Sequence, residues 1–186
     1  VRTYRNPVRT QEMGAYTLTL NAMQQKVVDA VIENARTEKK PCLIHGVTGS
    51  GKTEVYMELI AEAAGRGKQS IVLIPEIALT YQTVMRFYHR FGDRVSIMNS
   101  KLSPGERSDQ FERAKKGEID VMIGPRSALF TPFSNLGYII IDEEHEGTYK
   151  SETIPRYHAR ETAIERARMS GATVILGSAT PSIESF

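Results

Sequence analysis

A glycine-rich segment, residues 46–53, has the residue types and spacing that bind a triphosphate. Glycines let backbone N–H groups surround phosphate oxygens, Lys52 supplies positive charge at the outer phosphates, and the Thr53 hydroxyl can ligate Mg²⁺. A flexible turn is the alternative interpretation. An apolar run at 42–44 and a helix-like segment flank the loop, which favours a nucleotide site formed by Gly46, Thr48, Gly49, Ser50, Gly51, Lys52 and Thr53.

Acidic side chains follow a later apolar run. Residues 138–141 have the pattern of a buried strand, and Asp142, Glu143, Glu144 and His145 come directly after it. Open α/β folds bind ligands at the carboxyl ends of their strands. Carboxylates at this point can hold Mg²⁺ and position a water molecule, so the two segments together predict a site for a nucleotide and its metal.

Short apolar runs alternate with helical segments and must position both motifs. Asn21 is suited to cap a first helix, and Ser103, Pro104 and Glu106 are suited to the N-cap, first position and capping box of a later one. A further helix is expected after His158, with Ala163, Ile164 and Ala167 on one face. The alternation predicts an α/β fold with a mostly parallel sheet covered by helices on both faces; its strands are expected at 42–44, 71–74, 95–98, 121–123, 138–141 and 173–176.

The 186 residues, 40% of them hydrophobic, suit one domain at 20–186 preceded by a linker at 1–19. A net charge of +2 makes any nucleic-acid site a local one. We see no signal peptide or membrane span and expect a cytoplasmic location. Cys42, the single cysteine, is expected to pack in the core. The first residue, Val1, and helix-like final residues indicate a fragment of a longer protein.

Polar segments follow three more of the predicted strands, at 75–80, 124–130 and 177–181. With the phosphate loop and the acidic motif, they make most of the chain resemble the first motor lobe of a superfamily 2 helicase. Within that superfamily, the wording is similar to that of the primosomal replication-restart DNA helicases at 75–80, 126–130, 149–150 and 156–160. The resemblance implies a RecA-like P-loop NTPase fold. Pro125 and Ser151 depart from the family pattern, which has threonine and glutamine there.

The resemblance also implies roles at the ATP site. Lys52 would contact the outer phosphates, Thr53 and Asp142 would hold Mg²⁺, and Glu143 would orient the attacking water. His145 would join them as a catalytic residue and relay the nucleotide state, together with Ser178 and Thr180. Gln24 matches the glutamine that reads adenine in this superfamily; a solvent-facing helix glutamine is the alternative.

An aromatic and basic segment at 146–160 is expected to form a loop that couples DNA binding to hydrolysis. Tyrosines can stack on bases while arginines and lysines meet phosphates. The alternatives are a surface loop with solvated charges, a local salt bridge or cap for Arg126 and Ser127, and a helix cap for His158. The resemblance implies DNA contact or coupling by Arg126, Ser127, Tyr149, Lys150, Arg156, Tyr157, Arg160, Ser178 and Thr180.

In such a helicase the intact protein would use ATP and Mg²⁺ to unwind DNA 3′-to-5′ at stalled or abandoned forks. Implied partners are forked or single-stranded DNA, primosome proteins and single-strand-binding proteins, in the bacterial cytoplasm at the nucleoid. The second lobe and the zinc region have no counterpart here, so the lobe alone is expected to bind ATP or ADP weakly and hydrolyse slowly. Alternatives are another superfamily 2 DNA translocase and a non-catalytic, nucleotide-gated interaction module.

Overall fold

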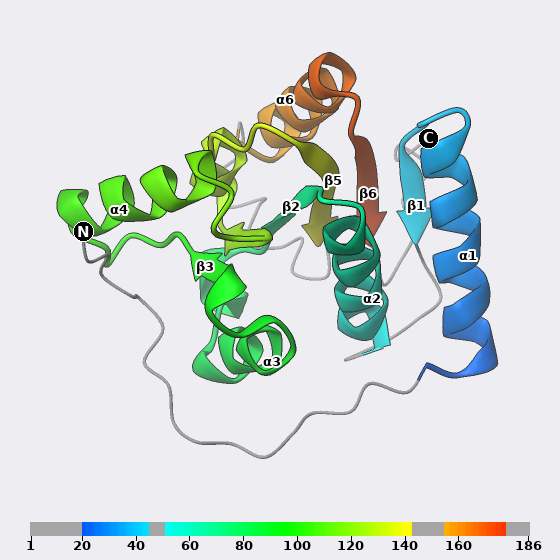
Figure 1. The fold of residues 1–186 in the computed structure, drawn as a ribbon, viewed down its shortest axis with the longest axis horizontal. Helices are drawn as coiled ribbons and strands as arrows, with labels where there is room; N and C mark the ends of the chain where they lie inside the picture. Colours follow the sequence, from blue (N-terminus) through cyan, green and yellow to red (C-terminus); the bar gives the residue numbers. More distant parts are fainter. Residues whose placement is uncertain (1–19, 45–50, 143–154, 178–186) are drawn as a thin grey trace.

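Six parallel strands form the sheet that positions the site (Figure 1). The structure is a computed structural model that describes residues 20–44, 51–142 and 155–177, the last segment with side chains from residue 159 on. The strand order is β1-β6-β5-β2-β4-β3, and every pairing is parallel. All six predicted strands are present: β1 (Cys42–Ile44), β2 (Gln69–Leu73), β3 (Val95–Ile97), β4 (Val121–Gly124), β5 (Leu136–Asp142) and β6 (Thr173–Gly177).

Helices cover both faces of this sheet, which confirms the predicted architecture. Figure 1 shows α4 and α6 above the sheet and α2 and α3 below it. The α-helices are α1 (Ala22–Arg36), α2 (Gly51–Gly65), α3 (Tyr81–Phe91), α4 (Pro104–Lys115) and α6 (Pro155–Ser170). Short 3₁₀ helices follow three of the strands or helices: η1 (Glu76–Ala78), η2 (Gly92–Arg94) and η3 (Arg126–Phe130).

Two apolar clusters, one on each face, result from the alternation of side chains along the strands. On β5, Tyr138 and Ile140 join the cluster formed with α1, α2 and α3, whereas Ile139 and Ile141 join the one formed with α4, η3 and α6. Successive strand residues point to opposite faces, so a strand covered on both sides must be apolar throughout. Every residue of β5 is buried, including the terminal Asp142.

Capping residues define two helix starts as predicted. Asn21 caps α1 in a capping box with Gln24, and Ser103 caps α4 in a capping box with Glu106. Each box satisfies backbone N–H groups that have no partner within the first turn.

The start of α6 differs from its prediction. The helix begins at Pro155, so residues 155–160, expected in a loop, are helical, and a cap role for His158 is wrong because it lies inside the helix. Proline is suited to the first helical position, where an N–H has no partner to lose. Ala163 and Ala167 are buried, but Ile164 is 37% exposed and lies off their face.

Cys42 lies on the edge strand β1, half-buried against the first apolar cluster. Its sulfur accepts a hydrogen bond from Asn34 Nδ2 at 2.8 Å, while burial raises the pKa of the thiol. The expected packing role is therefore confirmed, at the periphery of the core rather than within it.

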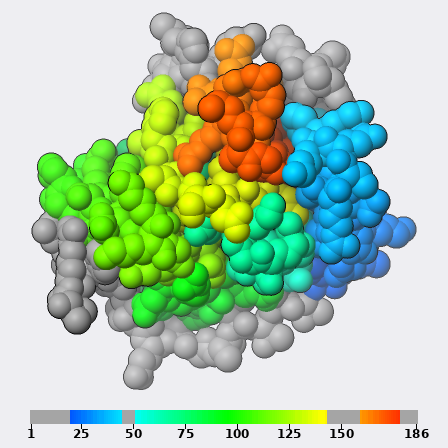
Figure 2. Space-filling model, turned by 45° about the horizontal axis from the view of Figure 1, so that its top comes forward, coloured from blue at the N-terminus to red at the C-terminus, as the bar shows by residue number. Residues whose placement is uncertain are grey.

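The segments that enter β2 and β5 meet at the opposite edge of the sheet from the site. Asn135 Nδ2 donates to the Gly67 carbonyl at 2.7 Å, and its backbone N–H donates to Gln69 Oε1 at 3.1 Å. Figure 2 shows these teal and yellow segments next to each other, with the orange end of α6 beside them. Parallel strands enter at a common edge, which leaves the other edge for the polar segments that follow them.

Candidate active site

Helix α2 carries Lys52 into the interior. The residues Lys52, Val55, Tyr56, Leu59, Ile60 and Ala63 follow the three- and four-residue spacing of one helix face, and all are buried. Lys52 is therefore the polar first member of an otherwise apolar stripe, with only 1% of its surface exposed. Gly51 begins the helix, and the N–H groups of such a helix end favour negative charge.

Asp142 ends β5 next to this lysine. Lys52 Nζ lies 3.8 Å from Asp142 Oδ1, and both side chains are almost fully enclosed. Taking two charges out of water is costly unless they are paired, so their proximity compensates part of the desolvation of each. The structure thus brings the basic residue of the phosphate loop and the first acid of the acidic motif together, 90 positions apart in sequence.

Mg²⁺ suits the oxygen donors at this point. Thr53 lies in the first turn of α2, partly buried, and Asp142 supplies a carboxylate at the strand end. Mg²⁺ keeps several of its waters and takes few protein ligands, so a hydroxyl and one carboxylate are a sufficient protein set. Across the described segments, no group of three or more His, Cys, Asp or Glu side chains forms a denser metal site.

Tyr56 belongs to the same site, although it was not predicted. Its hydroxyl donates to Asp142 Oδ1 at 3.4 Å, and the side chain is 1% exposed. One signal in the sequence could have indicated it: a tyrosine four residues after Lys52 shares the buried face of the helix, and a buried tyrosine hydroxyl needs a hydrogen-bond partner.

Gln24 is buried, which excludes a solvent-facing role. Its Nε2 donates to the Gly51 carbonyl at 3.2 Å and to Glu54 Oε2 at 2.9 Å, and its Oε1 accepts from the Asn21 N–H at 2.9 Å. The side chain therefore closes the capping box of α1 and joins that helix to the first turn of α2. The neighbouring Gln25 is exposed, and its side chain bonds locally, to Asp29 at 2.9 Å.

The polar segments after β2 and β4 lie at the carboxyl edge of the sheet, as predicted. Glu76 of η1 accepts hydrogen bonds from the Ser100 N–H at 2.7 Å and hydroxyl at 2.5 Å, which lower the pKa of this carboxyl. Thr80 caps α3, and Arg126 and Ser127 lie in the 3₁₀ helix η3. Arg126 is exposed and Ser127 half-exposed.

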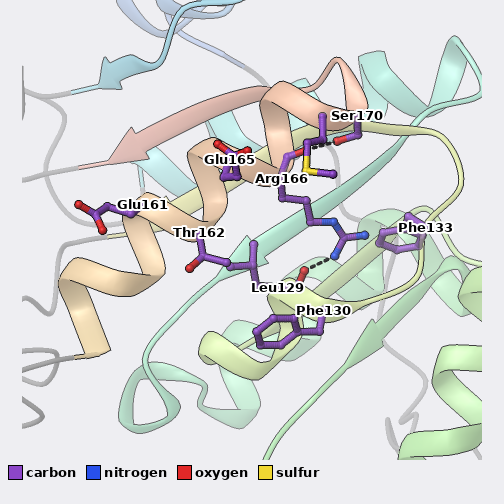
Figure 3. A pocket seen from close by; sticks show the side chains of 9 residues that line it. Leu129, Phe130, Phe133, Glu161, Thr162, Glu165, Arg166 and Ser170 are labelled. Atoms are coloured by element: carbon purple, nitrogen blue, oxygen red, sulfur yellow. Dashed lines mark hydrogen bonds between the residues drawn. The ribbon is translucent and has the colours of Figure 1, made fainter.

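Arg166, a second residue that was not predicted, joins α6 to η3. Its guanidinium donates to the carbonyl oxygens of Leu129 and Thr131, and burial lowers its pKa. Figure 3 shows this side chain reaching from α6 toward Leu129. Beside it lies a hollow of about 710 Å³, lined by Leu129, Phe130, Phe133, Glu161, Thr162, Glu165, Arg166, Met169 and Ser170. None of these residues takes part in the Lys52–Asp142 site.

The remaining predicted site residues lie on α6 or outside the described part of the chain. Arg160 is partly buried on α6, and the backbone of Arg156 and Tyr157 belongs to the same helix, without described side chains. Other residues lie outside the described part of the chain: Gly46, Thr48, Gly49, Ser50, Glu143, His145, Tyr149, Lys150, Ser178 and Thr180.

Comparison with known proteins decides the family. The model for the DEAD/DEAH box helicases matches residues 21–186, which is most of the chain. The chain belongs to the DEAD/DEAH box helicase family. The region that the family model matches includes both Lys52 and Asp142, which the structure brings together. Each described helix of this DEAD/DEAH box helicase chain is too short or too polar to cross a bilayer.

Curated relatives of this DEAD/DEAH box helicase chain carry the name replication restart protein PriA. The protein from Bacillus subtilis is 54% identical over 80% of this chain and 18% of its own length. The protein from Chlamydia trachomatis is 49% identical over 90% of this chain and 23% of its own length. The protein from Rickettsia felis is 41% identical over 97% of this chain and 28% of its own length. The matched part of this chain therefore spans 18% to 28% of the length of these relatives.

Solved helicase structures share the fold. RecG bound to a three-way DNA junction aligns with 91% of this chain and 22% of its own, at a TM-score of 0.67 and 24% identity. The UvsW helicase of bacteriophage T4 aligns with 94% of this chain and 55% of its own, at a TM-score of 0.57 and 16% identity. At such identities the likeness concerns the fold: the parallel sheet is that of a RecA-like helicase lobe.

Proposed function

We propose that the chain is the first, ATP-binding lobe of a replication-restart DNA helicase. The observation that carries this proposal is the approach of Lys52 Nζ to Asp142 Oδ1, 3.8 Å apart and enclosed at the carboxyl edge of the sheet. An amine and a carboxylate brought together there are what a nucleotide and its metal need. Identities of 41% to 54% to replication restart proteins support the choice of subfamily.

At the ATP site, Lys52 binds the outer phosphate oxygens, and the first N–H groups of α2 add further donors. Gln24 holds the start of α2 through the Gly51 carbonyl and can turn its amide to the adenine edge. Thr53 and Asp142 hold Mg²⁺, which neutralises charge on the phosphates when bound. Phosphoryl transfer depends mostly on such positioning and charge stabilisation.

Glu143 follows Asp142 directly and is assigned to orient the attacking water, by resemblance to the family. His145, Ser178 and Thr180 are assigned to relay the nucleotide state. The register supports this arrangement, because Asp142 pairs with Gly177, the residue before Ser178. The acidic motif and residues 178–180 therefore follow two neighbouring strands, β5 and β6, whose last residues are paired.

DNA would bind along the segments that follow β2 and β4 and along the start of α6. Exposed side chains in or next to these segments support this placement: Ile77 at 72%, Tyr81 at 56% and Phe130 at 64%, together with the exposed Arg126. Aromatic faces accept bases without sequence preference, while cations meet phosphates. The residues assigned to DNA contact or coupling are Arg126, Ser127, Tyr149, Lys150, Arg156, Tyr157 and Arg160.

The whole protein is proposed to unwind DNA 3′-to-5′ at stalled forks and to work with primosome and single-strand-binding proteins in the bacterial cytoplasm. The lobe alone should bind ATP or ADP weakly and turn over slowly. A charge supplied by a second lobe is worth roughly 4–7 kcal/mol of transition-state stabilisation, by analogy with arginine fingers. Zinc would belong to the remainder of the protein.

The test is ATP hydrolysis by the full-length protein, with and without forked DNA. Wild type should be stimulated by DNA. Lys52→Ala should lose both turnover and ATP binding, because the Lys52 amine touches the phosphates. Glu143→Gln should lose turnover and keep ATP binding, because Glu143 acts on the water and not on the phosphates. Lys115→Ala, at the exposed end of α4, is the matched control. Turnover retained by Glu143→Gln, or wild type without DNA-stimulated hydrolysis, would contradict the proposal.

A further inference from the structure

Tyr56 lies where three segments of the site converge. It follows Lys52 by one turn of α2, so both side chains lie on the buried face of that helix. Its hydroxyl donates to Asp142 Oδ1 at 3.4 Å, the same oxygen that Lys52 Nζ approaches at 3.8 Å. Two donors from one helix therefore converge on one oxygen at the end of β5.

Gly177 also lies against this phenol. A Cβ atom at this position would lie 1.6 Å from the Tyr56 hydroxyl oxygen and 2.9 Å from its Cζ. Real side chains do not approach so closely, so the tyrosine requires a glycine here. Gly177 ends β6 and pairs with Ile44 of β1 on one side and with Asp142 of β5 on the other. The hydroxyl thus lies against β6, the strand between β1, which precedes the phosphate loop, and β5, which ends at Asp142.

We propose that Tyr56 is a positioning residue for ATP hydrolysis, whose hydroxyl orients the Asp142 carboxylate and whose ring sets the spacing between α2 and the end of β6. This inference rests on the proposed ATPase function. A neutral hydroxyl can remain on the carboxylate while the lysine serves phosphate oxygens. A carboxylate whose orientation is held by a hydrogen bond loses less freedom when it binds Mg²⁺.

A second consequence concerns the end of β6. Because the phenol lies against both Asp142 and Gly177, a shift of α2 on nucleotide binding would be transmitted to the last residue of that strand.

The full-length protein with Tyr56→Phe tests the role, since phenylalanine keeps the ring and removes the hydroxyl. Tyr138→Phe is the matched control: Tyr138 is also fully buried, and its hydroxyl donates to Glu62 Oε2 at 3.1 Å, away from the site. Three quantities are compared: affinity for ADP with and without Mg²⁺, the Mg²⁺ concentration for half-maximal ATPase, and kcat with KM.

We expect Tyr56→Phe to raise the required Mg²⁺ concentration and lower kcat, each by roughly tenfold, as for the loss of other groups that orient a metal ligand. Affinity for ADP without Mg²⁺ should stay within about twofold of wild type, because no phosphate contact is removed. Tyr138→Phe should leave all these quantities unchanged, even if both variants lower the melting temperature equally.

Equal Mg²⁺ requirements and kcat values for the two tyrosine variants would overturn the positioning role. A wild-type protein without ATP hydrolysis would instead count against the proposed function. In that case Mg²⁺-dependent ADP binding still decides the role of Tyr56, since it needs no turnover.

Gly177→Ala provides an independent measurement. In the wild-type background its Cβ must displace the phenol oxygen, so the Mg²⁺ requirement should rise as in Tyr56→Phe. In the Tyr56→Phe background the phenol oxygen is absent, so Gly177→Ala should raise the Mg²⁺ requirement by a smaller factor. Contacting residues show such non-additivity, so strictly additive effects would contradict the contact as the cause.

Discussion

Gln24 Nε2 lies 2.9 Å from Glu54 Oε2, so a residue of the first helix is bonded to the first turn of the phosphate-loop helix. The same amide also serves the Gly51 carbonyl and the α1 cap. Gln24→Ala should therefore lower the free energy of unfolding by about 1–2 kcal/mol, through lost capping and buried hydrogen bonds. Urea denaturation measures this. Gln25→Ala, next to it and exposed, should change stability by less than about 0.5 kcal/mol; equal losses for the two variants would contradict the assignment.

The proposed recognition of adenine by Gln24 predicts a second, separate effect. Without its amide, the preference for ATP over GTP should fall, because the pairing with the adenine edge is lost. Competition binding to the full-length protein with each nucleotide measures the ratio. An unchanged ratio in Gln24→Ala would leave Gln24 with a purely structural role.

Gly124, at the end of β4, has no room for a side chain. A Cβ there would lie 2.5 Å from the Met98 carbonyl oxygen and 3.1 Å from the Ala128 Cβ. Gly124→Ala should cost about 1–3 kcal/mol of stability, since the neighbours are backbone and a buried cluster. Gly65→Ala is the control, with nothing within 4 Å and a helical position, and should be neutral or stabilising by up to about 1 kcal/mol. Thermal unfolding of both variants checks the contrast.

The Glu76–Ser100 contact predicts a pH dependence. Hydrogen bonds from Ser100 lower the pKa of the Glu76 carboxyl below its ordinary value of 4.5. A lowered folded-state pKa means that its contribution to stability is fully present above that value and is lost as the pH falls through the lower, folded-state pKa. Because Glu76 is exposed, Glu76→Gln should cost less than about 1 kcal/mol at pH 7. Urea unfolding at neutral and strongly acidic pH should show this difference shrinking as the pH falls; a constant difference would exclude the ionised contact.

Arg166 links α6 to η3 through the carbonyl oxygens of two buried residues, Leu129 and Thr131. Arg166→Leu should cost about 2 kcal/mol, because those oxygens lose their charged donor. The exposed side chain of Arg168 pairs with the exposed Glu165, so Arg168→Ala should cost no more than about 0.5 kcal/mol. Comparable unfolding midpoints for the two variants would show that the link carries no stability.

Local patterns were enough to predict the strands and the helix caps. Short apolar runs mark strands covered on both faces, and Ser103, Pro104 and Glu106 mark a helix start by hydrogen bonding within one turn. The same logic was available at Pro155, where proline in the first position indicated an earlier start of α6. The prediction there favoured a loop because aromatic and basic residues suggested DNA contact.

Contacts that depend on strand order could not be predicted from the sequence. The approach of Tyr56 to Gly177 exists because β6 lies between β1 and β5, and apolar patterns indicate strands but not their neighbours. The Lys52–Asp142 pair was accessible only through the motifs that carry it. Arg166 had no such motif, since an arginine in a polar helix gives no sign of the carbonyls it will meet.

The strand that leads into the phosphate loop is attached on one side only. Within the described sheet, β1 has three residues and pairs with β6 alone, whereas β5 is paired on both sides. A short edge ladder opens without the rest of the domain, so its amide hydrogens should exchange with solvent deuterium long before those of β2 and β5. Bound nucleotide should slow the amide exchange of β1 toward that of β2 and β5. The exchange rate of β1 then reports directly on occupancy of the site.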